Sequence, residues 1–192
     1  DSLAIIDLDG VFIAETENAS AYSDRLGSVT DTVSKIQARD LNSSYACAYY
    51  PWVQISDAKS GGTVYVPPSV VALGTFASND ASSELWFAPA GFNRGGLTAG
   101  SSGLTVTNVT ERVTSKKRDD LYENNINPIA KFPAEGIVIF GQKTLQQTSS
   151  ALDRINVRRL LIYVKKEISR MAAKVLFDNN VEVTWNRFTG MA

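Results

Sequence analysis

Leu3 to Val11 read LAIIDLDGV, and this stretch decides which fold the chain can adopt. Residues 3–8, apart from Asp7, and residues 11–13 are apolar at successive positions, so both faces of the strand that they predict must be buried. A strand that is apolar on both faces is typical of a parallel sheet covered by helices on each side. The stretch therefore predicts an α/β fold with a mixed, mainly parallel sheet flanked by helices.

Further strands and helices are expected to alternate along the chain. YACAYY at 45–50, which Pro51 ends, and GIVIFG at 136–141 read as buried strands, and GGTVYVPPS holds a shorter one. Apolar residues at helical spacing after Ser20, a candidate N-cap, predict the first helix. Helices are expected at 20–36, 69–86, 114–127 (stopped by Pro128) and 153–177, and residues 86–103 are expected to form a loop.

The end of the first strand permits one catalytic interpretation. An apolar run that ends in Asp7-x-Asp9-Gly resembles the nucleophile strand of magnesium-dependent, haloacid-dehalogenase-like phosphatases, in which Asp7 would attack phosphorus and Asp9 would act as acid and base. Such an enzyme also needs a later acidic pair at a strand end. The one acidic doublet, Asp119-Asp120, lies in a predicted helix. The phosphatase therefore stays as an alternative function.

Composition excludes several other kinds of site. The 192 residues contain no histidine, which removes histidine general bases and Ser-His or Cys-His nucleophile pairs. The single Cys47 lies within an apolar run and reads as a small buried side chain. The glycine-rich stretch GLTAGSSG lacks the Gly-Lys-Ser/Thr ending of a phosphate-binding loop. The sequence thus predicts no catalytic residue, no metal site and no cofactor.

The longest predicted helix, DRINVRRLLIYVKKEISRMAAKVLF at 153–177, has two distinct faces. Asp153 is its expected cap, and the apolar stripe spans an arc of about 120°, the width of a core-facing side. The stripe consists of Val157, Leu160, Leu161, Val164, Ile168, Met171, Ala172 and Val175. The remaining arc carries the candidate site residues, a basic face made of Arg154, Arg158, Arg159, Lys165, Lys166, Arg170 and Lys174.

The basic face has several interpretations. It contrasts with the first hundred residues, whose net charge is −6 against +5 for the remainder. A solvated helix face is the plainest interpretation, and a generic α/β binding module is another. Nucleic acid is disfavoured because no nucleic-acid-binding fold is recognisable and because Tyr163 is the only aromatic residue between Arg154 and Lys174. Membrane binding is disfavoured because the apolar stripe is needed for the core. An acidic protein surface remains as the partner to consider.

Six segments in order resemble the tail sheath proteins of contractile bacteriophages. They cover nearly the whole chain, and their order and spacing follow those of the family. The segments are YYPWVQI (49–55), VPPSVVALGTFASND (66–80), WFAPAGFNRGGL (86–97), LYENNINPI (121–129), GIVIFGQKTL (136–145) and DRINVRRLLIYVKKEI (153–168).

The resemblance implies a structural protein and not an enzyme. Residues 1–192 would be the conserved inner α/β domain, one part of a larger multidomain subunit whose N-terminal arm, outer domains and C-terminal arm lie outside this chain. Asp7 and Asp9 would be strand-end carboxylates that either have structural roles or contact a neighbouring subunit. Related sheaths occur in pyocin-like particles and in type VI secretion.

The resemblance also implies partners and a location. The subunits would form a helical stack of rings, a homo-oligomer that surrounds a tail tube and contracts to drive it through the host envelope. Baseplate and tail terminator would bind the ends of the sheath, and the basic face would meet an acidic outer surface of the tube. No nucleic acid or membrane insertion is implied. The expected location is the virion tail, assembled in the host bacterial cytoplasm.

Overall fold

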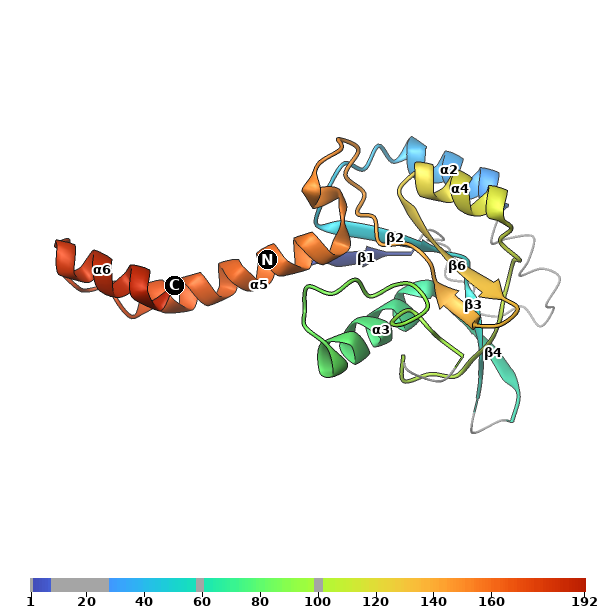
Figure 1. Ribbon diagram of the computed structural model, residues 1–192. Helices are drawn as coiled ribbons and strands as arrows, with labels where there is room; N and C mark the ends of the chain where they lie inside the picture. The colour runs from blue at the N-terminus through green and yellow to red at the C-terminus, as the bar shows by residue number, and fades with distance from the viewer. Residues whose placement is uncertain (1, 8–27, 58–60, 99–101) are drawn as a thin grey trace.

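A computed structural model describes residues 2–7, 28–57, 61–98 and 102–192. It consists of a body in which helices cover a sheet, and of two C-terminal helices that project from that body (Figure 1). Asp9 and Ser20 lie outside the described residues, so the expected roles of Asp9 and of the Ser20 cap are not described.

The main sheet has four strands in the order β1-β2-β6-β7. Parallel pairing joins β1 to β2, with Ala4 opposite Ala46, and β2 to β6, with Ala48 opposite Ile126, whereas β7 runs antiparallel to β6. The strands are β1 (Ala4–Ile6), β2 (Ala46–Tyr50), β6 (Ile126–Phe132) and β7 (Gly136–Ile139). The predicted mixed, mainly parallel sheet is confirmed.

The central strand β2 is buried at all five positions because helices cover both of its faces. Figure 1 shows α2 (Val29–Ala38) and α4 (Ser115–Glu123) on one side of the sheet and α3 (Pro68–Ser82) on the other. Cys47 and Tyr49 belong to the core on the α3 side, and Ala46, Ala48 and Tyr50 belong to the core under α2 and α4. Alternate side chains of one strand thus supply two cores.

A second sheet of three antiparallel strands extends the α3-side core. Its order is β4-β3-β5, with β3 (Val53–Ser56) in the centre between β4 (Thr63–Val66) and β5 (Val106–Val109). The sequence predicted β4 but missed β3 and β5, because each is four residues long and partly exposed and so lacks a continuous apolar run. Val53 and Val106, both almost fully buried, pack into that core.

Two predicted helices differ from the structure. The helix expected at 20–36 is interrupted at Ser28, the extended N-cap of α2, where Ser28 and Asp31 cap each other's backbone N–H groups; the expected start at Ser20 lies outside the described residues. Helix α4 ends at Glu123, and Pro128 lies inside β6 opposite Tyr50 instead of stopping the helix. The chain reverses at Asn125, whose φ is 60°, and this turn converts the expected last helical residues into the start of β6.

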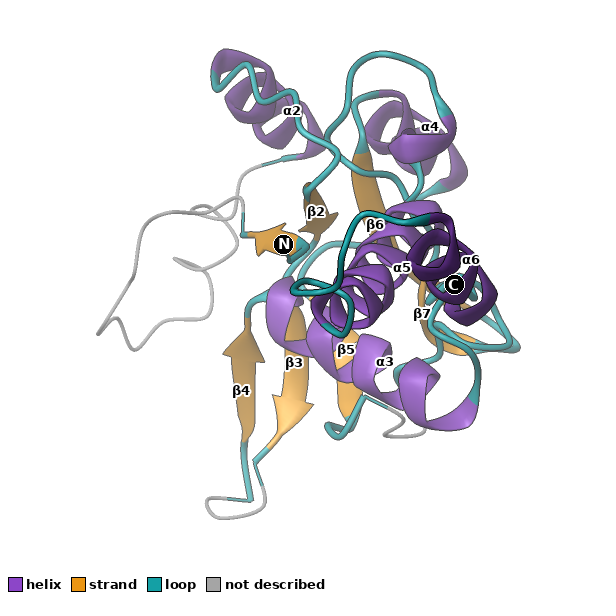
Figure 2. Cartoon of the chain, turned by 90° about the vertical axis from the view of Figure 1, so that its left-hand side faces the viewer, coloured by secondary structure: helices purple, strands orange, loops and turns teal. Residues whose placement is uncertain are grey.

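The C-terminal helices form a hairpin outside the body. A 3-10 turn at Ala151–Asp153 leads into α5 (Ile155–Ala173), and α6 (Glu182–Met191) folds back beside α5 (Figure 2). The predicted cap Asp153 is wrong, because Arg154 is the N-cap residue and makes no side-chain cap. Helix α6 was not predicted. We call these two helices the α5–α6 hairpin.

The predicted core-facing stripe of the long helix is also wrong for most of its length. In α5 the buried residues are Ile155 and Arg158, whereas Leu161, Val164 and Ile168 are 43%, 37% and 41% exposed. The stripe exists as a periodic pattern, but beyond its first two turns the helix projects from the body, as Figure 1 shows, so the rest of the stripe does not face the core. Large exposed apolar side chains continue through the hairpin, with Phe177 96% exposed.

Candidate functional site

Asp7, the candidate nucleophile, caps helix α3 instead of facing an open site. Its carboxylate accepts hydrogen bonds from the backbone N–H of Ser69 at 3.1 Å and from the Ser69 hydroxyl at 2.6 Å. Ser69 is the second residue of α3, whose N-cap Pro67 supplies no side-chain acceptor. A carboxylate at this end satisfies a free N–H and complements the helix dipole. The geometry therefore gives Asp7 a structural role.

Replacing Asp7 by alanine is expected to lower the free energy of unfolding by about 1 kcal/mol, because α3 loses its only described cap. Asp7→Asn keeps an acceptor oxygen for Ser69 and should cost less. Urea denaturation of the chain measures both. Asp120→Ala on the exposed side of α4 is the matched control, and equal midpoints for the Asp7→Ala and Asp120→Ala variants would contradict the capping role.

The other chemical candidates are buried or belong to regular structure. Asp119 and Asp120 lie in α4, as predicted. Burial raises the pKa of the Cys47 thiol to about 12, so this side chain stays protonated at neutral pH. Burial also raises the pKa of the neighbouring Tyr49 well above its ordinary value. Among the described residues, no group of three or more Cys, Asp or Glu side chains could hold a metal ion.

The described part of the chain also contains no helix with both the length and the apolar character needed to cross a lipid bilayer.

The seven basic residues of the predicted face divide into two groups. One group lies at the N-terminal end of α5, which we call its foot, and contacts the body: Arg154, Arg158 and Arg159. Lys165, Lys166, Arg170 and Lys174 lie on the distal half of the helix and are exposed. In the distal group Arg170 is paired with Glu167, three residues earlier on the same helix. The two groups are therefore different in their surroundings, although the sequence places them on one arc.

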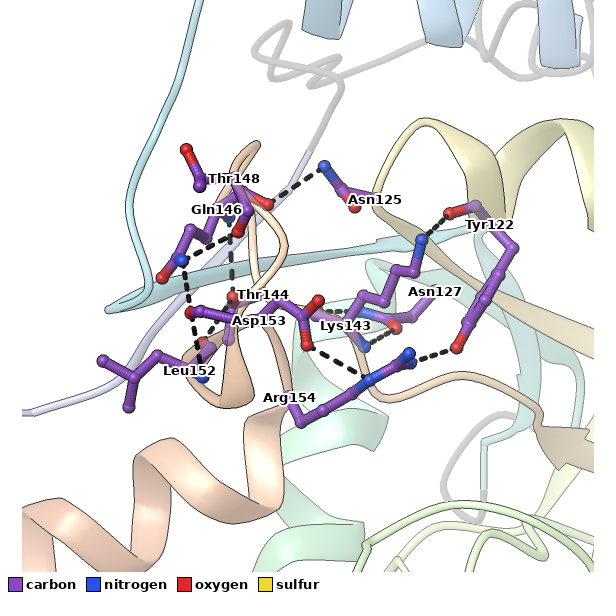
Figure 3. A network of polar contacts seen from close by, with 11 residues as sticks. Tyr122, Asn125, Asn127, Lys143, Thr144, Gln146, Thr148, Leu152, Asp153 and Arg154 are labelled. Atoms are coloured by element: carbon purple, nitrogen blue, oxygen red, sulfur yellow. Dashed lines mark hydrogen bonds and ion pairs between the residues drawn. The ribbon is translucent and has the colours of Figure 1, made fainter.

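Arg154 joins α5 to a polar network near the N-terminal end of β6, an interior strand of the main sheet (Figure 3). It pairs with Asp153 at 3.2 Å and donates to the hydroxyl of Tyr122 on α4. Lys143 lies over the Tyr122 ring, 4.1 Å from its centroid, and donates to the Tyr122 carbonyl at 2.8 Å. Arg154 thus connects the foot of α5 to α4.

Asn127 is the centre of the same network (Figure 3) and was missed by sequence analysis. It is fully buried in β6, donates to the carbonyls of Ala48 at 3.0 Å and Lys143 at 2.8 Å, and accepts from the Lys143 N–H at 2.6 Å. A polar residue between apolar neighbours in a buried strand was the available signal. The signal was missed because residues 114–127 were predicted to be helical, which placed Asn127 at the end of a helix and not in a strand.

Arg158 and Arg159 contact different parts of the body. Arg158 is 7% exposed, donates to the Ser44 hydroxyl and lies over the Tyr45 ring, 4.0 Å from the centroid. Arg159 pairs with Asp80 on α3. The prediction of a solvent-facing basic arc is therefore wrong for Arg158, because the loop before β2 covers it. The predicted contact between this face and a partner remains a prediction.

A pocket of about 450 Å³ lies beside this foot, between α4, the end of β7 and the loop at 88–91. Arg118, Tyr122, Gln142 and Arg154 are among its lining residues. Arg118 stacks on the Phe132 and Phe140 rings at 5.0 and 5.7 Å. Its lining combines arginine and aromatic surface with one carboxylate, Asp119. Arginine and aromatic side chains are enriched where proteins contact one another, so this lining suits a contact with another macromolecule.

Comparison with known proteins identifies relatives over most of the chain. No protein-family model matches it. The tail sheath proteins of Vibrio phage KVP40 and Enterobacteria phage T4 are 42% and 36% identical over 124 residues, which is 65% of this chain and 18% of each relative. The tail sheath protein of Salmonella phage ViI is 29% identical over 97% of the chain and 29% of the relative. The chain thus spans less than a third of these relatives' length.

Solved structures agree with these relatives in fold. The chain superposes in full on 53% of a chain in the contracted sheath complex of the extracellular contractile injection system PVC, with a TM-score of 0.70 and 22% identity. It matches the contracted helical sheath of the anti-feeding prophage with a TM-score of 0.66 and 21% identity, over 98% of this chain and 52% of that one. The resemblance to contractile tail sheath proteins predicted from the six segments is confirmed.

Proposed function

We propose, from this relationship to contractile tail sheath proteins, that the chain is the conserved inner α/β domain of a sheath subunit. The whole subunit is proposed to polymerise as a helical stack of rings around a tail tube and to contract, which drives the tube through the host envelope. The role is structural and not enzymatic. The observation that carries the proposal is the match to one tail sheath protein over 97% of the chain and to two others over 65% of it.

The proposed partners follow from the same assembly. Neighbouring copies of the subunit, the baseplate and the tail terminator would contact the sheath, and the tail tube would lie inside it. The proposed location is the tail of a virion, assembled in the host cytoplasm. The pyocin-like and type VI sheaths remain related assemblies of the same class.

The exposed cations of the α5–α6 hairpin support a contact with an acidic tube. Lys165, Lys166, Arg170 and Lys174 lie on the part of α5 that projects beyond the body, where they are accessible to a neighbour. Exposed ion pairs contribute about 0–1 kcal/mol each. Several such pairs can hold a sheath in register, and because each is weak they can all break when the sheath contracts. We therefore assign the proposed tube contact to these four distal residues and not to all seven residues of the predicted basic face.

The test is assembly of the full-length protein on its tail tube, followed by negative-stain electron microscopy and co-sedimentation at increasing salt. Replacing Lys165, Lys166 and Lys174 together by glutamine should lower tube affinity about tenfold, since three pairs of roughly 0.5 kcal/mol each are lost. The affinity of the unchanged protein should fall with salt, because exposed ion pairs are screened.

A matched control removes the same charge from the body through Arg112→Gln, Lys116→Gln and Lys131→Gln, all at exposed positions. The control should assemble like the unchanged protein. Equal loss in both variants would assign the effect to net charge and contradict a tube contact through the hairpin. If the unchanged protein forms striated tubes neither alone nor with its tube protein, the sheath function itself is wrong.

A further inference from the structure

Helix α5 is held by contacts within its first two and a half turns. Ile155 is fully buried in the α3-side core, and its N–H donates to the Gln142 carbonyl at 2.9 Å. Tyr163 packs on Trp86 with 6.4 Å between ring centroids. Further along, Val164 and Ile168 are more than a third exposed. The direction of the hairpin is therefore set at the foot of the helix.

Arg158 holds one side of this foot. Its guanidinium lies 4.0 Å from the centroid of the Tyr45 ring and donates to the hydroxyl of Ser44. Both residues belong to the segment that leads into β2, the central strand of the parallel part of the sheet. Because Arg158 is buried and its named partners are an uncharged hydroxyl and a ring, it acts by filling and bonding this site and not by meeting an outside partner.

Arg159 holds the opposite side. It pairs with Asp80 near the C-terminal end of α3, and its guanidinium lies 4.9 Å from the centroid of the Phe76 ring one turn earlier. Phe76 in turn packs edge-on against Tyr49 of β2, with 6.5 Å between centroids. The side chain of Arg159 is 11% exposed. Its contact therefore connects α5 to α3 and, through Phe76, to the central strand.

Two adjacent residues of a helix point about 100° apart around its axis. Arg158 and Arg159 therefore reach in different directions, one to the segment before β2 and the other to α3. A helix fixed at one buried residue could still tilt about it, whereas a helix fixed on two further sides resists tilting. The distance from Arg159 to the end of α5 is about 21 Å at 1.5 Å per residue. A tilt of about 10° at the foot would therefore move the far end by about 4 Å, enough to break most polar contacts with a partner.

We propose that Arg158 and Arg159 are positioning residues, a two-sided bracket that sets the angle at which the α5–α6 hairpin leaves the body. They would then control assembly without belonging to the surface that meets the tube. That consequence rests on the proposed sheath function, whereas the bracket itself is a property of the chain alone.

The bracket is tested by distance measurements with paired spin labels. One label is placed on the hairpin through Ser169→Cys and one on the exposed part of β5 through Asn108→Cys. The native Cys47 is fully buried and should not react with the label in the folded chain. The unchanged chain should give a narrow distance distribution by double electron–electron resonance. Replacing both Arg158 and Arg159 by methionine should broaden it or shift it by several ångströms.

Controls separate positioning from general stability. Lys165→Met with Lys166→Met removes the same charge about two turns further along α5 and should leave the distribution narrow. Arg159→Asp alone should broaden it, and adding Asp80→Arg should narrow it again, because the ion pair is restored with its partners exchanged. This pair of variants decides the question if the double methionine variant does not fold.

An unchanged distribution in the Arg159→Asp variant, or no recovery on exchange, would overturn the bracket. Neither result depends on a tube, so the bracket can fail while the sheath function holds. Conversely, if the sheath function is wrong, the distances between the spin labels are unaffected, because they are measured on the chain without a tube.

Discussion

Asn127→Ala is expected to lower the free energy of unfolding by about 3 kcal/mol, one of the two largest effects that we predict for a single substitution. The Asn127 amide lies fully buried between β2 and the segment after β7, where it satisfies the Ala48 carbonyl and both backbone polar groups of Lys143. A buried polar group left without a partner costs about 1–3 kcal/mol. Alanine would remove the hydrogen-bond partner of three such groups, the Ala48 carbonyl and the carbonyl and N–H of Lys143. The lost packing of the amide adds to this cost.

Chemical denaturation monitored by circular dichroism measures this effect. Asn108→Ala is the matched control, because Asn108 also lies in a strand but is exposed. The control should change stability by less than about 0.5 kcal/mol, as exposed substitutions usually do. If Asn127→Ala and Asn108→Ala denature at the same midpoint, the Asn127 network does not hold these strands together.

Gly74→Ala is expected to destabilise the chain by at least about 2 kcal/mol, although alanine favours a helix over glycine by about 1 kcal/mol. A Cβ atom at this position would lie 1.9 Å from the Ser102 carbonyl oxygen and 2.8 Å from its carbonyl carbon. Both are backbone atoms, so a change of rotamer cannot relieve the clash. Helix α3 and the Ser102 segment would have to separate, which would open the core around Val71 and Leu97.

Gly190→Ala is the control for this substitution. Gly190 is also inside a helix, α6, but apart from its chain neighbours and the helix's own nearby backbone, no atom of the described residues lies within 4 Å of the position that its Cβ would take. The same change should there be neutral or stabilising by up to about 1 kcal/mol. The denaturation midpoint is therefore expected to fall in the Gly74→Ala variant and to stay the same or rise in the Gly190→Ala variant. A gain in stability from Gly74→Ala would show that the close approach to Ser102 does not constrain α3.

The contrast between Arg158 and Lys166 shows why the basic face divides as it does. Both were predicted for one solvent-facing arc, yet the loop at Ser44 and Tyr45 covers Arg158 whereas Lys166 is exposed. The covering loop is more than a hundred positions away in the sequence. Helical spacing cannot reveal such a contact, because it describes one helix and not its neighbours. For the same reason the spacing could not show that the apolar stripe leaves the core after two turns.

Pro128 is the corresponding example for the sheet. Next to a predicted helix it read as a stop signal, which is its usual meaning near a helix end. In the structure the turn at Asn125 ends the helix before it, and β6 pairs with β2 through Ala48 and Ile126. The competing signal, a run of apolar residues from Ile126 to Ala130, is interrupted by the polar Asn127, although all five positions are buried. Asn127 satisfies three backbone groups there, so the interruption is itself a feature of the fold.

By itself the sequence indicated β1, β2, β4 and β7, the helices α3, α4 and α5, the relationship to sheath proteins and the absence of histidine chemistry, but not β3, β5, β6 or α6. These depend on local pattern and on residue identity, both of which are present in the unfolded chain. Only the tertiary structure decided that Asp7 caps α3, that Asn127 is the centre of a buried network, and that the basic residues of α5 separate into a foot and a projecting surface. Each of these depends on which distant segment covers a side chain, and burial by a distant segment leaves no periodic trace in the sequence.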